Sequence, residues 1–144
     1  MRAVVQRVSE ARVVVEGRVI GAVAQGLCVL LGIARGDSRE DAERLAAKIA
    51  RLRIFEGAGG TFERSVLDEH GEALVVSQFT LLAETARGNR PSFSNAAGSA
   101  EAKELYDAFC EALAEHGVPV ATGSFGAQMR VELVNEGPVT IVLG

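Results

Sequence analysis

The sequence predicts a single-domain α/β protein, in which a curved, largely antiparallel and barrel-like β-sheet carries two packed amphipathic helices. Three observations predict this class. The 144 residues suffice for one domain, residues 1–144, with a sizeable core. Runs rich in Val and Ile form hairpin-like pairs at both ends of the chain, and two segments between them have helical periodicity. This order of elements does not suit a doubly wound parallel sheet.

The first part of the chain predicts three strands. Residues 3–15 are rich in Val, and the Glu-Gly pair at 16–17 predicts a tight turn into a returning strand over residues 18–24. Residues 27–34 form a nearly continuous apolar run, which is typical of a strand that is covered on both faces.

Two segments predict helices. Ser38, with Asp41 three residues later, resembles a capping box, and apolar residues then recur at helical spacing. Ser99 is expected to cap the second helix, and Gly117 with the following proline is a typical stop signal. The glycine-rich run at 56–60 lacks a phosphate-binding pattern, so we expect a flexible connection there.

Composition limits the location and the class of protein. Cys28 and Cys110 are isolated, so we expect buried thiols in a reducing cytosol, with neither a metal site nor a disulfide framework. The chain starts without a signal-peptide pattern and has no bilayer-spanning apolar run, so we expect a cytoplasmic protein without a membrane partner. The net charge of −4 argues against a surface that binds nucleic acid everywhere, and leaves room for a local basic patch.

A buried strand turns polar at its end. Residues 73–76 are apolar, whereas Ser77, Gln78 and Thr80 follow them. Strand alternation would place Gln78 and Thr80 on one face, and Ser77 and Phe79 on the other. Buried polar groups are costly unless they are hydrogen-bonded, so this strand end is a candidate site. Bonding to neighbouring backbone explains the same residues equally well.

A long polar loop without periodicity covers residues 84–98. Long loops in compact domains tend to be functional or disordered, and Phe93 predicts that this loop packs down. Arg87 and Arg90 are its candidate phosphate contacts.

The last stretch, residues 131–144, consists of two β-branched runs around a polar break that ends in Gly137 and Pro138. A plain turn between two strands is the simplest interpretation. However, glycine reaches conformations that other residues do not, and a bond before proline becomes cis at modest cost. Such a turn can aim carbonyl oxygens in directions that ordinary turns do not reach.

No pattern supplies an obvious general base. His70 falls in a turn and His116 at a helix end, and the common hydrolase, metalloprotease and P-loop motifs are absent. Thr80 is the strongest candidate for an attacking hydroxyl, although a threonine hydroxyl is a poor nucleophile without activation. Catalysis would then depend on backbone donors, on positioning, or on a group that the substrate carries.

Three stretches of the chain resemble the D-aminoacyl-tRNA deacylase family, of the D-tyrosyl-tRNA deacylase type. They are Ser77-Gln78-Phe79-Thr80-Leu81, Arg87-Gly88-Asn89-Arg90-Pro91-Ser92-Phe93, and the terminal region from Thr122-Gly123-Ser124-Phe125-Gly126-Ala127-Gln128-Met129 through Asn135-Glu136-Gly137-Pro138-Val139-Thr140. The similarity extends from the first residues to the last, and the order and separation of these motifs are specific.

The resemblance implies a homodimeric hydrolase that cleaves the ester between a D-amino acid, or often glycine, and the terminal ribose of tRNA. It implies no cofactor, no metal and no DNA partner. Gly137 and Pro138 of one subunit, joined by a cis bond, would reach into the other subunit's pocket and reject L-residues. The resemblance gives the remaining site residues as the pocket wall, Ser77, Gln78, Phe79 and Thr80, and the neighbours of the terminal adenosine, Phe125 and Met129.

Two routes to hydrolysis are open. The backbone N–H groups of Phe79 and Thr80 can stabilise an oxyanion while the neighbouring ribose hydroxyl positions water, or Thr80 can attack directly. A different class of function is a non-catalytic module that binds RNA ends through Arg87, Arg90 and Phe93. Such a module would bind the ester without cleaving it.

Overall fold

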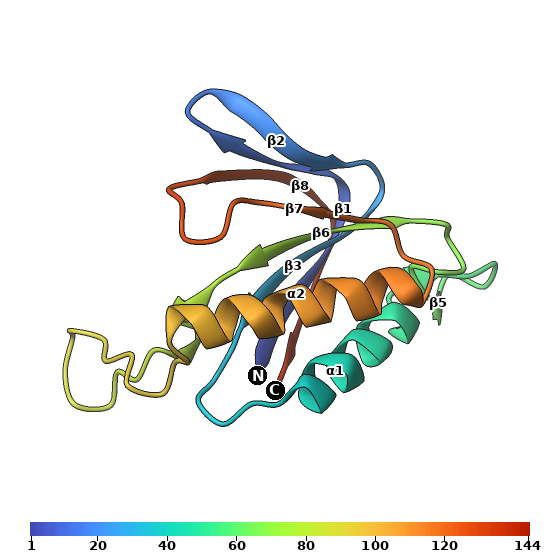
Figure 1. The fold of residues 1–144 in the computed structure, drawn as a ribbon. Coiled ribbons are helices and arrows are strands. Elements are labelled where there is room, and N and C mark those ends of the chain that lie inside the picture. The colour runs from blue at the N-terminus through green and yellow to red at the C-terminus, as the bar shows by residue number, and fades with distance from the viewer.

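The computed structural model describes all 144 residues. The chain forms one main sheet, a small hairpin and two long helices, and the two termini lie close together (Figure 1). The elements in chain order are β1 (Arg2–Val15), β2 (Arg18–Val23), β3 (Gly26–Gly32), α1 (Arg39–Arg51), β4 (Phe55–Glu56), β5 (Phe62–Arg64), β6 (Glu72–Ser77), the 3₁₀ helix η1 (Phe79–Leu82), α2 (Ser99–Glu115), β7 (Val120–Thr122) and β8 (Arg130–Leu143).

The sheet is mixed, which corrects one detail of the predicted class. Strand β1 pairs antiparallel with β2, β3 and β8, as the hairpins at the chain ends predict. However, β3 pairs with β6 and β6 with β7 in parallel. The reason is that α1 lies between β3 and β6, and α2 between β6 and β7. A helical crossover returns the chain to the same end of the sheet, and the next strand is then parallel.

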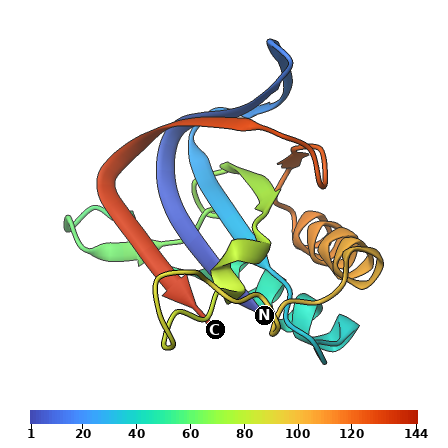
Figure 2. The same ribbon diagram turned by 90° about the vertical axis from the view of Figure 1, so that its left-hand side faces the viewer.

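The sheet curls strongly and almost closes into a barrel. The long strands β1 and β8 run side by side along a curved path (Figure 2). Their register shifts twice, between Gln6 and Val8 and between Val8 and Glu10. Such bulges bend and twist a ribbon. On the other side, β2 approaches β7 so closely that a Cβ built on Gly21 would lie 2.2 Å from the Thr122 carbonyl oxygen. Only glycine permits this approach.

Both helices pack against the larger hydrophobic cluster of the sheet. Their caps follow from the sequence only in part. Ser38 caps α1 as predicted, because Asp41 N–H donates to Ser38 Oγ at 3.2 Å and Ser38 N–H donates to Asp41 Oδ2 at 2.8 Å. The Ser38 backbone N–H lowers the pKa of the Asp41 carboxyl. The prediction for α2 is wrong by one residue: Gly98 is the N-cap, and Ser99 is already helical.

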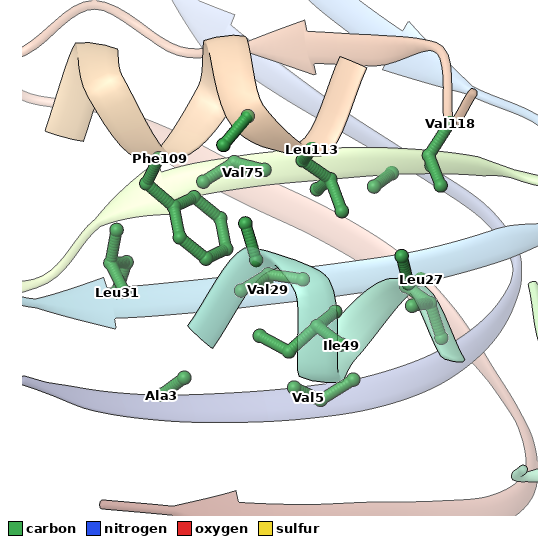
Figure 3. Close-up of a cluster of buried hydrophobic side chains, with 14 of the residues drawn as sticks. Ala3, Val5, Leu27, Val29, Leu31, Ile49, Val75, Phe109, Leu113 and Val118 are labelled. Carbon is green, nitrogen blue, oxygen red and sulfur yellow. The ribbon is translucent and has the colours of Figure 1, made fainter. Parts of the chain in front are cut away.

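The main core lies between the sheet and the helices. Alternate residues of β1 and β3 point toward Ile49 of α1 and toward Phe109 and Leu113 of α2, all fully buried (Figure 3). The opposite side chains of β3 enter a second, smaller cluster, where Cys28 packs with Leu74. Strand β3 is therefore covered on both faces, as its continuous apolar run predicts.

The terminal region does not form a turn. Strand β8 runs without interruption from Arg130 to Leu143, so the predicted turn that ends in Gly137 and Pro138 is wrong. The Gly137–Pro138 peptide bond inside β8 is cis. Strand β8 continues through the Gly-Pro step because it pairs with β1 on both sides of that step. The flanking pairs are Val8–Asn135 and Gln6–Thr140.

The capping box of α1 generates a stability prediction. Ser38→Ala removes the acceptor for the Asp41 N–H and should lower the free energy of unfolding by about 1 kcal/mol, measured by urea denaturation. Ser99→Ala is the matched control, because Ser99 makes no capping hydrogen bond. Equal losses in the two variants would contradict this account of the cap.

Candidate active site

One cavity of about 590 Å³ lies where β6 ends, between the start of α2 and the loop that precedes β8. We call it the main pocket. It is lined by Ile33, Val76, Ser77, Gln78, Phe79, Phe93, Ala96, Ala97, Gly98, Ser99, Ala102, Phe125, Gly126, Ala127, Gln128, Met129 and Val131. A largely apolar cavity with a few convergent polar groups is the usual form of a small-molecule site.

The strand that carries the polar residues ends earlier than its sequence predicts. Strand β6 stops at Ser77, and η1 begins at Phe79, so the prediction that residues 77–80 alternate between two faces is wrong. The Gln78 N–H still bonds to the Leu31 carbonyl of β3 at 2.8 Å. The backbone then turns away, which brings Ser77, Gln78 and Phe79 together on the pocket wall.

The main pocket contains no ionisable side chain. Neither histidine lines it, and the two thiols are poor nucleophiles. Burial raises the pKa of Cys28 to about 11, and burial is also the main cause that raises the pKa of Cys110 to about 11. Since the thiolate is the reactive form, both cysteines are inert at neutral pH. A reaction in this pocket has to use neutral groups of this subunit.

The start of η1 offers two free donors beside the pocket. The backbone N–H groups of Phe79 and Thr80 have no acceptor within η1 and donate to no carbonyl elsewhere in the chain. The first N–H groups of any helix lack an internal partner, so they are available to an oxyanion. The Thr80 side chain does not line the pocket, and its Oγ1 accepts a hydrogen bond from Gln78 Nε2.

The opposite wall comes from the loop before β8. Phe125 and Met129 both line the pocket. That they lie beside a terminal adenosine stays a prediction of the resemblance. The Phe125 ring lies 6.0 Å from the ring of Tyr106, whose hydroxyl donates to the Val75 carbonyl at 2.6 Å. Burial raises the pKa of Tyr106 above its ordinary value, so its hydroxyl stays protonated as a structural donor.

Gly137 and Pro138 do not line the pocket of their own subunit. Both are exposed on β8. Beneath them lies Arg7, which is only 7% exposed. Its Nε donates to the Glu136 carbonyl at 3.0 Å and its Nη1 to the Ile54 carbonyl at 2.9 Å. The guanidinium therefore fixes the main chain that leads into the Gly-Pro step.

The geometry of Gly137 itself requires glycine. Its φ is +126°, and a Cβ there would lie 3.0 Å from the backbone nitrogen of Val139 and 3.1 Å from Arg7 Nη2. An L side chain rarely adopts this φ, and here it would also crowd two fixed groups.

Arg87 and Arg90 lie outside the main pocket, in a neighbouring polar cavity on the 84–98 loop. Phe93 of the same loop does pack down, with its ring 5.0 Å from that of Phe79 in an edge-to-face arrangement. The loop is therefore joined to the pocket wall through these two rings.

Sequence reasoning missed several residues that form the pocket or anchor the Gly-Pro step. It assigned no role to Ala96, Ala97 or Gly98, small residues that leave space at the start of α2. Nothing in the sequence distinguishes them from ordinary loop residues. It also missed Arg7, for which a signal existed: strand alternation from Ala3 and Val5 places this charge on the buried face.

Comparisons with known proteins match nearly the whole chain. The family model described as D-Tyr-tRNA(Tyr) deacylase matches residues 4–144. A D-aminoacyl-tRNA deacylase of Roseiflexus sp. (strain RS-1) is 61% identical over 143 residues, which is 99% of this chain and 92% of that protein. The corresponding protein of Ruegeria pomeroyi is 58% identical, over 98% of this chain and 97% of its own length.

Two solved structures have the same fold. A structure named c-Myc DNA Unwinding Element Binding Protein is 44% identical, with a TM-score of 0.94 over 100% of this chain and 98% of the other. A structure described as that of a probable eukaryotic D-amino acid tRNA deacylase has a TM-score of 0.83 over 99% and 97% of the two chains. At 16% identity, the second match shows the fold alone. The chain therefore belongs to the D-aminoacyl-tRNA deacylase family, whose members are hydrolases of aminoacyl-tRNA esters.

Proposed function

We propose that this protein hydrolyses D-aminoacyl-tRNA, and glycyl-tRNA, to free amino acid and tRNA in the cytoplasm. The observation that carries the proposal is the main pocket, in which two free backbone N–H groups stand beside a cavity without any ionisable side chain. Such a pocket suits a substrate that is already activated. It supports an enzyme over a module that only binds RNA ends.

The chemistry requires little from the protein. Water adds to the ester carbonyl carbon, the resulting oxyanion accepts from the Phe79 and Thr80 N–H groups, and the ribose oxygen leaves with a proton. The ribose hydroxyl beside the ester can position the water and pass on its proton, so no basic side chain is needed. Fixed donors aimed at a developing negative charge typically contribute about 3–4 kcal/mol each to lowering the barrier.

Positioning falls to the side chains. Ser77 and Gln78 offer hydrogen bonds to the substrate on one wall, while Phe125 and Met129 provide an apolar surface for the terminal adenosine on the other. Adenine stacks well on such surfaces because every base has a π-face. A pocket lining without charged side chains also suits an enzyme that accepts amino acids with different side chains.

Selection of handedness, in our proposal, comes from a second copy of the chain. Gly137 and Pro138 are exposed and do not line their own pocket, while large apolar side chains elsewhere on β8 and on β2 are uncovered. Val134 and Val142 are 49% and 74% exposed, and Val19 and Ile20 are 52% and 45% exposed. Uncovered apolar side chains on the strand that carries the Gly-Pro step are compatible with a protein interface along β8. A homodimer formed along β8 would let main-chain carbonyls of the Gly-Pro step reach the partner's pocket.

Rejection of L-aminoacyl esters by main-chain atoms would explain why the enzyme accepts many side chains and yet only one handedness. A carbonyl held in place grips the α-ammonium group and occupies the direction in which an L side chain would point, whatever that side chain is. Arg7 supports this role because it anchors the Glu136 carbonyl from a buried position.

The activity is tested with chiral substrates. The purified protein should hydrolyse D-tyrosyl-tRNA at least about a hundredfold faster than L-tyrosyl-tRNA, because each 1.4 kcal/mol of clash gives a factor of about ten. Release of labelled tyrosine measures both rates. Equal rates on the two esters, or binding without any hydrolysis, would contradict the proposal.

Thr80 distinguishes the two hydrolytic routes. Its Oγ1 accepts from Gln78 and no basic side chain stands near to activate it, so we expect Thr80→Ala to keep kcat within about tenfold of the unmodified enzyme. Thr61→Ala, at an exposed threonine before β5, is the matched control. A kcat lowered by more than about a thousandfold would instead identify Thr80 as the nucleophile.

The cross-subunit arrangement is tested with mixed dimers. Ala97→Trp should fill the main pocket of one subunit, and Gly137→Ala should relax D over L selection. In a purified heterodimer of the two variants, the open pocket belongs to the Gly137→Ala subunit but faces the native Gly-Pro step of its partner. Its D/L rate ratio should equal that of the native enzyme. A relaxed ratio would mean that Gly137 acts on its own subunit, and a monomer in sedimentation would exclude the arrangement.

A further inference from the structure

A second cavity of about 560 Å³ lies in the 84–98 loop and has no apolar residue in its lining. We call it the arginine cavity. It is lined by Glu84, Arg87, Gly88, Asn89, Arg90, Ser92 and Ser94. In Figure 1 this loop, drawn in yellow, projects beyond the first turn of α2 and away from the sheet.

The arginine cavity is held beside the main pocket. Glu84 and Ser92 exchange two backbone hydrogen bonds, of 2.8 and 2.9 Å, which close the intervening segment into a hairpin. The next residue, Phe93, lines the main pocket and packs on Phe79, whereas Ser92 and Ser94 line the arginine cavity. One short stretch of backbone therefore forms the wall between the two cavities.

The positive charges of the arginine cavity have no partner inside the chain. Arg87 and Arg90 form no ion pair, although Arg39 and Arg44 on α1 do. The cavity contains one acid, Glu84, and its carboxylate accepts the Ala86 N–H at 2.8 Å. Two unpaired guanidinium groups thus meet in a polar hollow of a protein whose net charge is −4.

We propose that the arginine cavity binds a backbone phosphate of the tRNA 3′ strand, adjacent to the nucleotide whose ester occupies the main pocket. The proposal rests on the proposed function, since it places a second part of the same substrate. A guanidinium group can donate two parallel hydrogen bonds to two oxygens of one phosphate. The serine hydroxyls and the Asn89 amide of the cavity can add neutral donors. Phosphate contacts fix register and carry no sequence information, so this site would serve every tRNA alike.

The test compares a charge-neutral variant of the cavity with a matched control. Arg87→Gln with Arg90→Gln removes both cations, and Lys48→Gln with Arg51→Gln removes two exposed, unpaired cations of α1. Each is measured on D-tyrosyl-tRNA and on D-tyrosyl-adenosine, which has the ester and the base but no phosphate. The first double variant should raise KM for the tRNA ester about tenfold with kcat unchanged, and should leave the adenosine ester unaffected.

Binding of uncharged tRNA, followed by fluorescence anisotropy against salt concentration, measures the same site without hydrolysis. The slope of log Kd against log salt should fall by roughly 0.7 for each phosphate that the variant no longer binds. The proposal is overturned if the cavity variant behaves like the α1 control, or if hydrolysis of the two esters is impaired equally. It is also overturned if the cavity variant weakens binding of duplex DNA but not binding of tRNA in the same anisotropy measurement. If the native protein cleaves neither ester, the proposed activity fails, while the anisotropy measurement still decides the phosphate site.

Discussion

The pairing of β1 with three other strands is the constraint on which the rest of the molecule depends. One edge of β1 pairs with β8 over nearly its whole length, and the other edge is shared between β3 and β2. A strand that serves two neighbours along one edge must bend between them, and the bulges in β1 and β8 supply the bend. The curvature brings β2 against β7 and leaves the pocket at the open end.

The same pairing explains how a buried charge is tolerated. Arg7 lies on the inner face of β1, where an unpaired guanidinium would cost several kcal/mol, on the order of a typical domain's whole stability margin. It is satisfied by two carbonyls and lies 3.8 Å from Glu56 and 5.9 Å from the centre of the Phe55 ring. One side chain thereby links β1, β4 and the residue before the Gly-Pro step.

The main pocket likewise avoids buried charge. Its neutral lining and its two free N–H groups use what any strand end and helix start provide, and it adds no charged group that would need compensation. The charges of Arg87 and Arg90 are placed instead on the exposed 84–98 loop, where water solvates them. An uncharged reaction site beside a cationic loop suits a substrate whose reacting group is neutral and whose remainder is a polyanion.

The sequence by itself determined the fold class, the α1 capping box, the two-faced burial of β3 and, through the motifs at residues 77–81 and 122–140, the family. These are features set by local periodicity, by nearest neighbours or by short specific runs. Only the tertiary structure decided that β6 runs parallel to its neighbours, that residues 135–138 continue a strand, that Arg7 is buried, and that Arg87 and Arg90 share a cavity apart from the main pocket. Each of these depends on which distant segment lies alongside, and strand pairing between distant parts of the chain leaves no trace in local pattern.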